Sequence, residues 1–478
     1  MNIFSKFPRT FWIANLIELF ERWAWYGFFM LFANYLTGSS DAGGLEFTQN
    51  QKGILMGVGT GILYFLPVLT GAIADRYGYK KVLFLSFLIY VSAFLLLPLF
   101  DTFTGVFLMF LYLAVGAALF KPIISATIAK TTTSETASIG FGLFYMMVNI
   151  GAFFGPLVTL LFKGSSHLIF YVSAGIITLN FILLFFYKEP GRQKEKPESV
   201  PLRETFAGIF RNMASILKDT RFLVFLLIVA GFWTMYNQLF FTLPVFISQW
   251  VDTSVLYHFF QAYVPFISQN YSPAPGVMDP EFVTNVDALY IILFQVIVSS
   301  LVMKMKPLQS MMSGFLVCSI GMSLTLVSQN VLFTFVAIFI FAVGEMAGSP
   351  KITEYIGRIA PPDRKALYMG YSFIPVFLGN VLAGFISGVV YQAMSDKVAI
   401  VRKFAVERGL SLPDGLSNNA YFDEVARQVG LTPQALTDLL WNQYDPSRMW
   451  WVILAIGVAS AAGLFIYDRV VTSRAASE

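Results

Sequence analysis

The stretch IELFERWAWYGFF (Ile17–Phe29) lies in the first long apolar run of the chain, yet it carries three charged residues within a turn and a half. Glu18, Glu21 and Arg22 stand at positions i, i+3 and i+4, so they project from one face of a helix. A charge that faces lipid at a helix centre costs about 2.5–3.5 kcal/mol on insertion scales. We therefore expect the three side chains to face protein or a water-filled cavity. Arg22 should pair with at least one carboxylate, leaving the other acid partly unpaired and able to take up a proton.

The composition shows that this charged stretch belongs to a membrane protein. Of 478 residues, 56% are hydrophobic and 13% are charged, and the mean hydropathy is +0.67, whereas soluble chains carry roughly 25% charged residues. A membrane-spanning helix needs about 20 mostly apolar residues. On that template the sequence predicts about twelve spans, which begin near residues 10, 50, 80, 104, 138, 167, 221, 284, 308, 331, 365 and 449.

The basic residues orient these spans. They gather in every second connection, for example at Lys80, Lys81 and in the block 188–221, while the first five opposite loops hold only Lys52 and Lys163. By the positive-inside rule both termini are expected in the cytoplasm. The net charge of +4 is thereby explained by orientation, and no nucleic-acid partner is expected. Compact loops favour a bacterial inner membrane as the location.

Two hydrophilic segments divide the chain. The first segment, residues 188–220, lies between the first six predicted spans and the last six. This arrangement predicts two related halves around a central cavity, with a ligand near the midplane. Thr432 is a plausible N-cap and Pro433 a plausible first residue for a helix in the second segment. The predicted divisions are an N-terminal six-helix bundle (1–187), a cytoplasmic linker with an amphipathic helix (188–220), helices 7–11 of the C-terminal bundle (221–394), an extracytoplasmic helical insertion (395–447), and helix 12 with the tail (448–478).

Three further ionisable residues lie in predicted spans: Lys121, Asp287 and Glu345. Each either forms a structural ion pair or lies on a path for a substrate or a proton, and a place on such a path is the more frequent role of an intramembrane charge. For Asp287, which lies near the end of a predicted span, a position at the membrane interface is a third alternative. The sequence holds no metal-ligand cluster, no nucleophile–histidine pairing and no phosphate-binding loop, so neither catalytic nor metal-binding residues are predicted and the protein is expected not to be an enzyme. Composition alone leaves a transporter, a channel and a lipid-handling protein open.

Two motifs narrow these possibilities. GAIADRYGYKK (Gly71–Lys81) resembles the inner-loop motif of the major facilitator superfamily, with Tyr79 where an arginine is usual. The resemblance implies a gating role for Asp75 and Arg76. The opening stretch, Glu18-x-x-Glu21-Arg22 followed by aromatic residues and a glycine, is similar to the ExxER signature of the proton-coupled oligopeptide transporters within that superfamily.

Agreement with the oligopeptide transporters continues in order over about residues 10–390. It includes Tyr64 and Pro67, Lys121-Pro122, FYMMVNIG (Phe144–Gly151), Phe232-Trp233 with Gln238, GEMAGSP (Gly344–Pro350) and LGNVLAG (Leu378–Gly384). The resemblance implies an all-α membrane protein of twelve transmembrane helices in two six-helix bundles, the major facilitator fold. To this the sequence adds the small helical outer insertion.

The resemblance also implies alternating access driven by inward proton movement, with protons as the coupling ion, no other cofactor, a peptide-like small-molecule substrate, a lipid bilayer as surroundings and a monomeric state. Arg22 and Lys121 would hold a substrate carboxylate and Glu345 its amino group. The implied substrate-binding residues are Arg22, Trp25, Tyr26, Tyr64, Lys121, Asn149, Trp233, Asp287 and Glu345. The implied proton-coupling residues are Glu18, Glu21, Arg22, Glu345 and Asp287.

The departures from the family pattern concern the acids. The seventh helix usually carries an acid between Trp and Gln, where this chain has Tyr236 and Asn237, and Asp287-Ala288 replaces an Asn-Pro of the eighth helix. We expect Asp287 to take over a proton-coupling or amine-binding role; if it lies near Glu345, mutual repulsion would raise the pKa of one of the two acids. The first reading is import of di- or tripeptides or peptide-like zwitterions. The alternatives are a proton-coupled transporter of another small organic solute, such as a modified amino acid, a peptide-like natural product or an organic anion, and a non-transporting sensor or lipid-handling protein.

Overall fold

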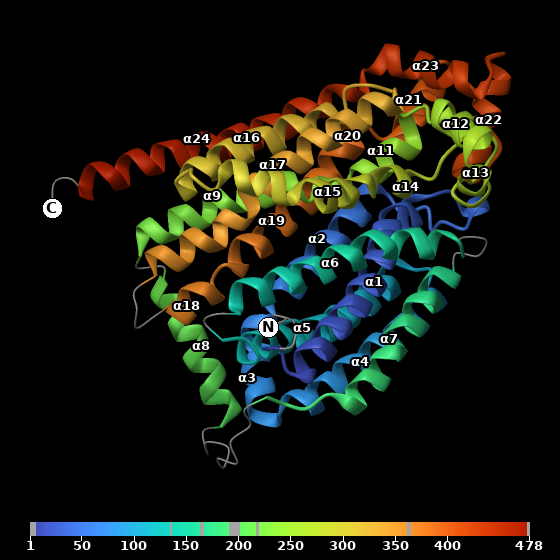
Figure 1. Cartoon of the computed structure of the whole chain (residues 1–478). Coiled ribbons are helices and arrows are strands. Elements are labelled where there is room, and N and C mark those ends of the chain that lie inside the picture. Colours follow the sequence, from blue (N-terminus) through green and yellow to red (C-terminus); the bar gives the residue numbers. More distant parts are fainter. Residues whose placement is uncertain are drawn as a thin grey trace. The chain divides into compact units, whose positions relative to one another are not determined.

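The computed structural model describes residues 6–133, 136–162, 167–190, 201–216, 219–360 and 365–475, and within these ranges it contains helices and no β-strand (Figure 1). The first part of the predicted linker (191–200), Lys163 and the last three residues lie outside the described residues. The expectation of an all-helical chain is thereby confirmed.

The helices group into two compact units. Unit 1 comprises Met1–Phe28, Gly59–Ala230 and Ile352–Leu378, and unit 2 comprises Phe29–Val58, Gly231–Lys351 and Gly379–Glu478. Each unit takes residues from both halves of the chain, so the units are not the two predicted bundles, whose bounds stay a prediction.

Among the described residues, unit 1 contains seven complete helices and parts of others. Helix α4 packs against α5 and α7, and α3 packs against α5 and α8 (Figure 1). In the core of unit 1, Phe28 of α1 (Arg9–Thr37) contacts Phe94, Phe110 and Phe170. The bounds are α3 (Pro67–Tyr77), α4 (Tyr79–Leu96), α5 (Phe103–Lys130), α6 (Ala137–Leu160), α7 (Leu168–Phe186), α8 (Leu202–Ile216) and α18 (Lys365–Gly370), with a 3₁₀ turn at Leu97–Leu99.

Five helices run through the boundary between the units: α1 (Arg9–Thr37), α2 (Gln49–Phe65), α9 (Thr220–Tyr236), α17 (Val331–Ile359) and α19 (Phe373–Phe385). In unit 2, α16 packs along α24. The other helices of unit 2 are α10 (Gln238–Phe241), α11 (Leu243–Trp250), α12 (Ser254–Tyr263), α13 (Pro265–Asn270), α14 (Pro280–Thr284), α15 (Val286–Val302), α16 (Pro307–Leu324), α20 (Tyr391–Met394), α21 (Lys397–Glu407), α22 (Asn418–Gln428), α23 (Pro433–Tyr444) and α24 (Met449–Ala475). Short 3₁₀ turns occur at Ser40–Ala42 and Pro446–Arg448, and a π-helical turn at Ile386–Val390.

The described residues contain ten helices that are long and apolar enough to cross a membrane, or eleven if the bent pair α2 and α3 forms one span. Every one of them begins near a predicted start. Helix α1 is 29 residues long but is not among these helices, since Glu, Arg and Asn residues lower its hydropathy. The predicted number of twelve is reached only when α1 is counted as a span despite its charges.

The predicted short helices are present. The amphipathic linker helix is α8, and the insertion contains α21, α22 and α23. Thr432 caps α23 by accepting a hydrogen bond from the amide of Ala435, with Pro433 at the first helical position, which confirms the predicted start. The helices α12 and α13, which lie between two spans, were not predicted.

Candidate functional site

In unit 1, close packing of α1 against α6 brings the charged stretch up to its neighbours. Gly151 and Gly155 of α6 face the α1 backbone: a Cβ on Gly155 would lie 2.5 Å from the carbonyl oxygen of Trp23, and one on Gly151 would lie 2.7 Å from Cβ of Arg22. Small residues permit such close approach of membrane helices. The glycines of the FYMMVNIG stretch and of the opening motif, Gly27 included, therefore position the charges of α1.

The three charges of α1 form one ion cluster. Arg22 contacts both acids: its Nε lies 3.2 Å from Glu18 Oε1 and its Nη2 lies 2.5 Å from Glu21 Oε2. The other oxygen of Glu21 accepts a hydrogen bond from the hydroxyl of Tyr90 on α4. All three charged side chains are buried. Arg22 therefore pairs with at least one carboxylate, as expected: it bonds Glu21 closely. Among the described residues Glu18 has only the longer contact with Arg22 and accepts no hydrogen bond, so it is the less tightly held acid.

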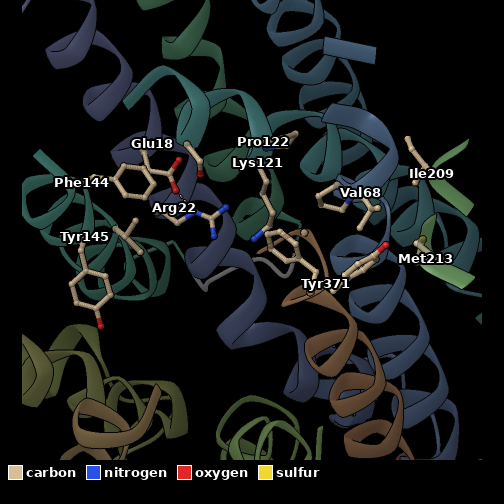
Figure 2. Close-up of a pocket in the computed structure, with 15 residues that line it drawn as sticks. Glu18, Arg22, Val68, Lys121, Pro122, Phe144, Tyr145, Ile209, Met213 and Tyr371 are labelled. Carbon is tan, nitrogen blue, oxygen red and sulfur yellow. Dashed lines mark ion pairs between the residues drawn. The ribbon is translucent and has the colours of Figure 1, made fainter. Parts of the chain in front are cut away.

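Glu18 and Arg22 line a cavity of about 610 Å³, whereas Glu21 does not. Figure 2 shows Arg22 and Lys121 pointing into the same space, with Glu18 beside Arg22. The ammonium group of Lys121 lies 4.4 Å from the centre of the Tyr64 ring, and Glu18 interacts electrostatically with Lys121. The further lining residues are Pro67, Val68, Pro122, Ser125, Phe144, Tyr145, Val148, Ile209, Met213, Gly370, Tyr371 and Phe373.

Lys121 is positioned by a helix defect. Pro122 has no amide hydrogen, so the carbonyl of Ala118 loses its normal partner within α5. The hydroxyl of Thr70 on α3 donates to that carbonyl at 2.6 Å, as expected where no water can satisfy a backbone group. The same bond holds α3 against α5, and Pro67 and Val68 of α3 line the same cavity as Lys121; Figure 2 labels Val68 there.

The other predicted residues of unit 1 lie around this cavity without all lining it. Tyr26 follows Arg22 by one turn and interacts with it electrostatically. Asn149 donates to the backbone carbonyl of Tyr145 at 2.9 Å and Trp25 is buried against Phe110; neither is among the lining residues. Their predicted substrate contacts stay predictions.

At another place in unit 1 the predicted gating residue Asp75 accepts a hydrogen bond from the hydroxyl of Tyr79 at 3.0 Å. That hydroxyl accepts from Lys130 at 2.9 Å, and the Tyr79 amide donates to Glu189 at 3.0 Å. Tyr79, which stands where the family motif has an arginine, thus connects α3, α5 and the residues after α7. Arg76 lies over the ring of Tyr77.

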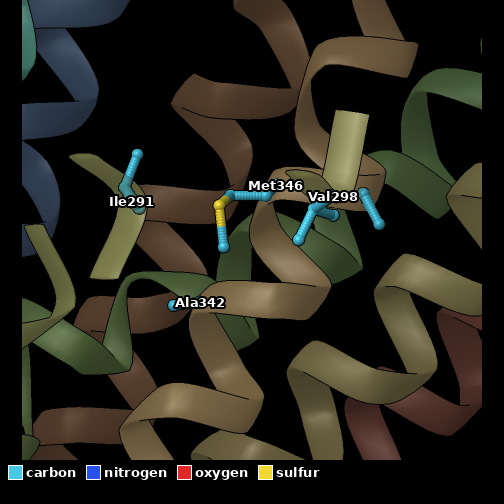
Figure 3. Packing of buried hydrophobic residues seen from close by; sticks show 5 residues of the cluster. Ile291, Val298, Ala342 and Met346 are labelled. Atoms are coloured by element: carbon cyan, nitrogen blue, oxygen red, sulfur yellow. The ribbon is translucent and has the colours of Figure 1, made fainter. Parts of the chain in front are cut away.

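In unit 2, apolar packing places two acids together. Ile291 and Val298 of α15 pack against Ala342 and Met346 of α17, and Met346 lies between them in Figure 3. Asp287 precedes Ile291 by four residues and so continues the same face of α15. It is buried and interacts electrostatically with Glu345.

Tyr236, which stands where the family usually has an acid, contacts one acid of this pair. The hydroxyl of Tyr236 donates to Glu345 Oε1 at 2.9 Å. The second oxygen of Glu345 and Oδ1 of Asp287 are buried and have no hydrogen-bond partner within the described residues. Trp233 stacks edge-on against Tyr236, and its indole nitrogen is likewise without a described partner. At the position where the seventh helix of the family usually has an acid, this chain therefore has Tyr236, a neutral residue that donates a hydrogen bond to Glu345.

Sequence reasoning missed several residues of these two clusters. Tyr90 lies within the apolar helix α4 and Tyr371 lies in the turn between α18 and α19, and neither tyrosine belongs to a sequence pattern that indicates a site. Ile209 and Met213 belong to the predicted amphipathic linker helix, but the sequence does not indicate that they line the cavity. Cys318 interacts electrostatically with both Glu345 and Asp287, which only the packing of α16 against α17 reveals.

Comparisons with known proteins agree with this arrangement. Residues 11–267 match the family model described as Major Facilitator Superfamily. An uncharacterised MFS-type transporter of Bacillus subtilis is 24% identical over 79% of this chain and 85% of its own length. The dipeptide and tripeptide permease A of Erwinia pyrifoliae is 28% identical over 50% of this chain and 46% of its own length.

Among solved structures, a POT family transporter in complex with 5-aminolevulinic acid superimposes with a TM-score of 0.71 over 97% of both chains, at 14% identity. That likeness establishes the fold. The family model covers more than half of the sequence, and the helices follow the fold of the solved transporter. The protein is therefore a multi-pass membrane transporter that belongs to the Major Facilitator Superfamily.

Proposed function

We propose that this chain is a proton-coupled symporter of the oligopeptide-transporter type, which imports di- and tripeptides or peptide-like zwitterions by alternating access. The observation that carries the proposal is the cavity of unit 1, where Arg22 and Lys121 meet within about 610 Å³. Small-molecule sites usually measure about 300–1,000 Å³. The name of the Erwinia permease supports the same substrate class.

The chemistry of the cavity suits a carboxylate. Arg22 already shares its charge between two acids, whereas no ion pair joins Lys121 to an acid within the described residues. Lys121 therefore supplies the positive charge that a substrate carboxylate would meet, and Arg22 supplies further donors. The apolar side chains Val68, Phe144 and Val148 would accept peptide side chains of varied shape.

The acid pair of unit 2 suits the other pole of a zwitterion. Two buried carboxyl groups with unpartnered oxygens, Asp287 and Glu345, cannot both stay ionised without a cation, because like charges in a low dielectric repel and lose hydration. A proton or a substrate ammonium group satisfies them. Exchange of one for the other would couple proton movement to substrate movement, with Glu18 and Glu21 as the corresponding acids of unit 1.

The driving force is sufficient for accumulation. One charge that moves through about 100 mV releases about 2.3 kcal/mol. At about 1.4 kcal/mol for each tenfold change, this drives roughly fifty-fold accumulation. Protons are thus the only coupling ion that the proposal needs, and we place the transporter as a monomer in a bacterial inner membrane with both termini in the cytoplasm.

The test is to record the internal pH of proteoliposomes under a negative-inside potential while a mixture of di- and tripeptides is added. Acidification in the wild type that disappears in Glu18→Gln and in Glu21→Gln supports proton–peptide symport. Wild-type protein that is folded but silent contradicts it. In that case the same assay with amino-acid-like solutes tests the second candidate function.

The second candidate is transport of another small organic solute by the same mechanism. Two observations favour it: Tyr236 replaces the usual acid beside Glu345, and the structurally similar POT family transporter binds 5-aminolevulinic acid. A response to δ-amino acids together with none to peptides would establish this alternative. A protein that binds such solutes without moving protons would instead indicate a sensor.

A further inference from the structure

The function proposed above assigns no role to the insertion at 395–447, although the insertion packs closely against the other helices of unit 2. Its helices α21, α22 and α23 pack against one another around buried Phe404, Val425 and Leu440. Trp441 of α23 makes edge-on contacts with Phe246 and Trp250 of α11. The insertion is therefore a rigid extension of the second half of the chain.

The start of α22 in the insertion contacts a loop from the first half of the chain, residues 38–48 between α1 and α2. This loop also belongs to unit 2. The amide of Asn418 donates to Glu46 Oε1 at 2.7 Å, and the amide of Asn419 donates to Ser39 Oγ at 3.0 Å. The side chain of Asn419 donates to Asp41 Oδ1 at 3.0 Å. Because the first amides of a helix have no partner within it, the loop supplies the acceptors that α22 needs.

Glu46 is the centre of these contacts. The same Oε1 atom also accepts from the Ser40 amide at 2.9 Å and from the Ser39 hydroxyl at 3.1 Å. Glu46 has a φ of +52°, a left-handed conformation that costs energy in a non-glycine residue. The contacts of its carboxylate compensate for this strain, so the loop and α22 hold each other in place.

Next to these contacts, α2 of the first half packs tightly on α19 and the following π-helical turn of the second half. A Cβ on Gly57 would lie 2.8 Å from Cα of Gly384, and one on Gly388 would lie 3.2 Å from Cα of Asn50. The Asn50 amide donates to Gln392 at 2.9 Å, and Gln49 donates to Asp396 at 3.1 Å. This seam, defined by Gln49–Gly57 and Gly384–Asp396, must part whenever the transporter opens on the side that carries the insertion.

We propose that α22 and loop 38–48 form a strap, centred on Glu46, that holds this seam closed and must release before the transporter opens on the insertion side. The strap crosses from the second half of the chain to the first, as a restraint on opening requires. The inference rests on alternating access as part of the proposed function, but not on the identity of the substrate.

The strap is not a sensor of mildly acidic pH. Burial raises the pKa of Glu46, but the amides of Asn418 and Ser40 and the hydroxyl of Ser39 outweigh it, so the pKa lies below its usual value of 4.5. The carboxylate that holds the strap is therefore ionised throughout the neutral range. Release must come from movement of the helices themselves.

The test uses Cys318→Ser protein with Ser387→Cys as the reporter, because Ser387 is fully buried beside Gly384 and Gly388 and the change is nearly isosteric. The reaction rate of this thiol with a membrane-impermeant maleimide measures how often the seam opens. Glu46→Gln is expected to raise the rate about tenfold, which corresponds to about 1.4 kcal/mol. Glu424→Gln is the matched control, because Glu424 lies on the same helix and bonds Arg427 and Gln428 within it.

A second variant, Ser39→Ala, removes another acceptor of α22 and is expected to raise the rate as well, which protects the test against misfolding of Glu46→Gln. Unchanged rates in both strap variants overturn the proposal. Equal increases in the strap variants and in Glu424→Gln also overturn it, because they indicate general loosening. Since labelling needs no substrate, its outcome is independent of the pH assay for symport.

Discussion

Lys121 and Arg22 line one cavity, but the structure predicts that their removal has different consequences. Lys121 has no ion pair with an acid in the described part of the chain, whereas Arg22 is buried between Glu18 and Glu21. Lys121→Gln should therefore reduce substrate binding with little loss of stability. Arg22→Gln should destabilise the fold itself, because it leaves two buried carboxylates without their cation.

The magnitudes separate the two effects. A hydrogen bond to a charged group contributes about 1.5–3 kcal/mol, so Lys121→Gln should weaken binding of a peptide carboxylate by about 10- to 150-fold. Loss of one partner of a buried ion pair typically costs about 3–5 kcal/mol, and the near-complete burial of Arg22 and both acids places Arg22→Gln in that range. The contact of Lys121 with the Tyr64 ring adds only about 0.5–1 kcal/mol of stability.

The assay is a double-mutant cycle between protein and ligand. Binding of a dipeptide and of its C-terminal amide is measured by calorimetry for the wild type, Lys121→Gln and Lys121→Arg, and each variant is melted in detergent. Lys121→Gln should weaken the free acid and leave the amide unchanged, while Lys121→Arg should retain most of the affinity. If the amide loses as much affinity as the acid, or if Lys121→Gln melts as early as Arg22→Gln, the assigned roles are wrong.

Three further predictions test other parts of the structure. Gly155→Ala should destabilise the protein by about 1–3 kcal/mol through overpacking against α1, whereas Gly142→Ala on the same helix, where a Cβ meets nothing within 4 Å, should be neutral or slightly stabilising in thermal melts. Asp287→Asn should reduce proton flux in proteoliposomes while the protein stays folded; wild-type flux and binding would exclude a coupling role. The pKa of Glu46 is lower in the folded protein than its usual value. The ionised carboxylate therefore stabilises the strap fully above about pH 4.5, and this stabilisation is lost as the pH falls through the folded-state pKa. The ratio of the labelling rate of Glu46→Gln to that of the protein with Glu46 intact should therefore stay constant from pH 8 to 6 and fall toward one only below about pH 4.5.

Much of the fold could be predicted from the sequence because the signals are local. Span positions follow from runs of apolar residues, and the start of α23 follows from Thr432 and Pro433, which act within one turn. The i, i+3, i+4 spacing of Glu18, Glu21 and Arg22 places them on one face regardless of what that face meets. Such features depend on hydropathy and on helix geometry alone.

The partners of these residues could not be predicted in the same way. Nothing in the sequence around Tyr90 indicates that its hydroxyl completes Glu21, and nothing around Thr70 indicates that it bonds the carbonyl that Pro122 leaves free. Both contacts join separate helices, so they exist only once those helices have packed.

The sequence by itself determined that the chain is a helical membrane protein and that the charges of α1 avoid lipid, and it predicts six spans before the linker and six after it. The tertiary structure decided that Arg22 is shared by two acids while Lys121 is not, and that Tyr236 bonds Glu345. It also placed α22 on loop 38–48, some 370 residues away along the chain. The physical reason is the range of each interaction: hydropathy and helical spacing act within about 20 residues, whereas hydrogen bonds and ion pairs require atoms about 3 Å apart that only packing brings together.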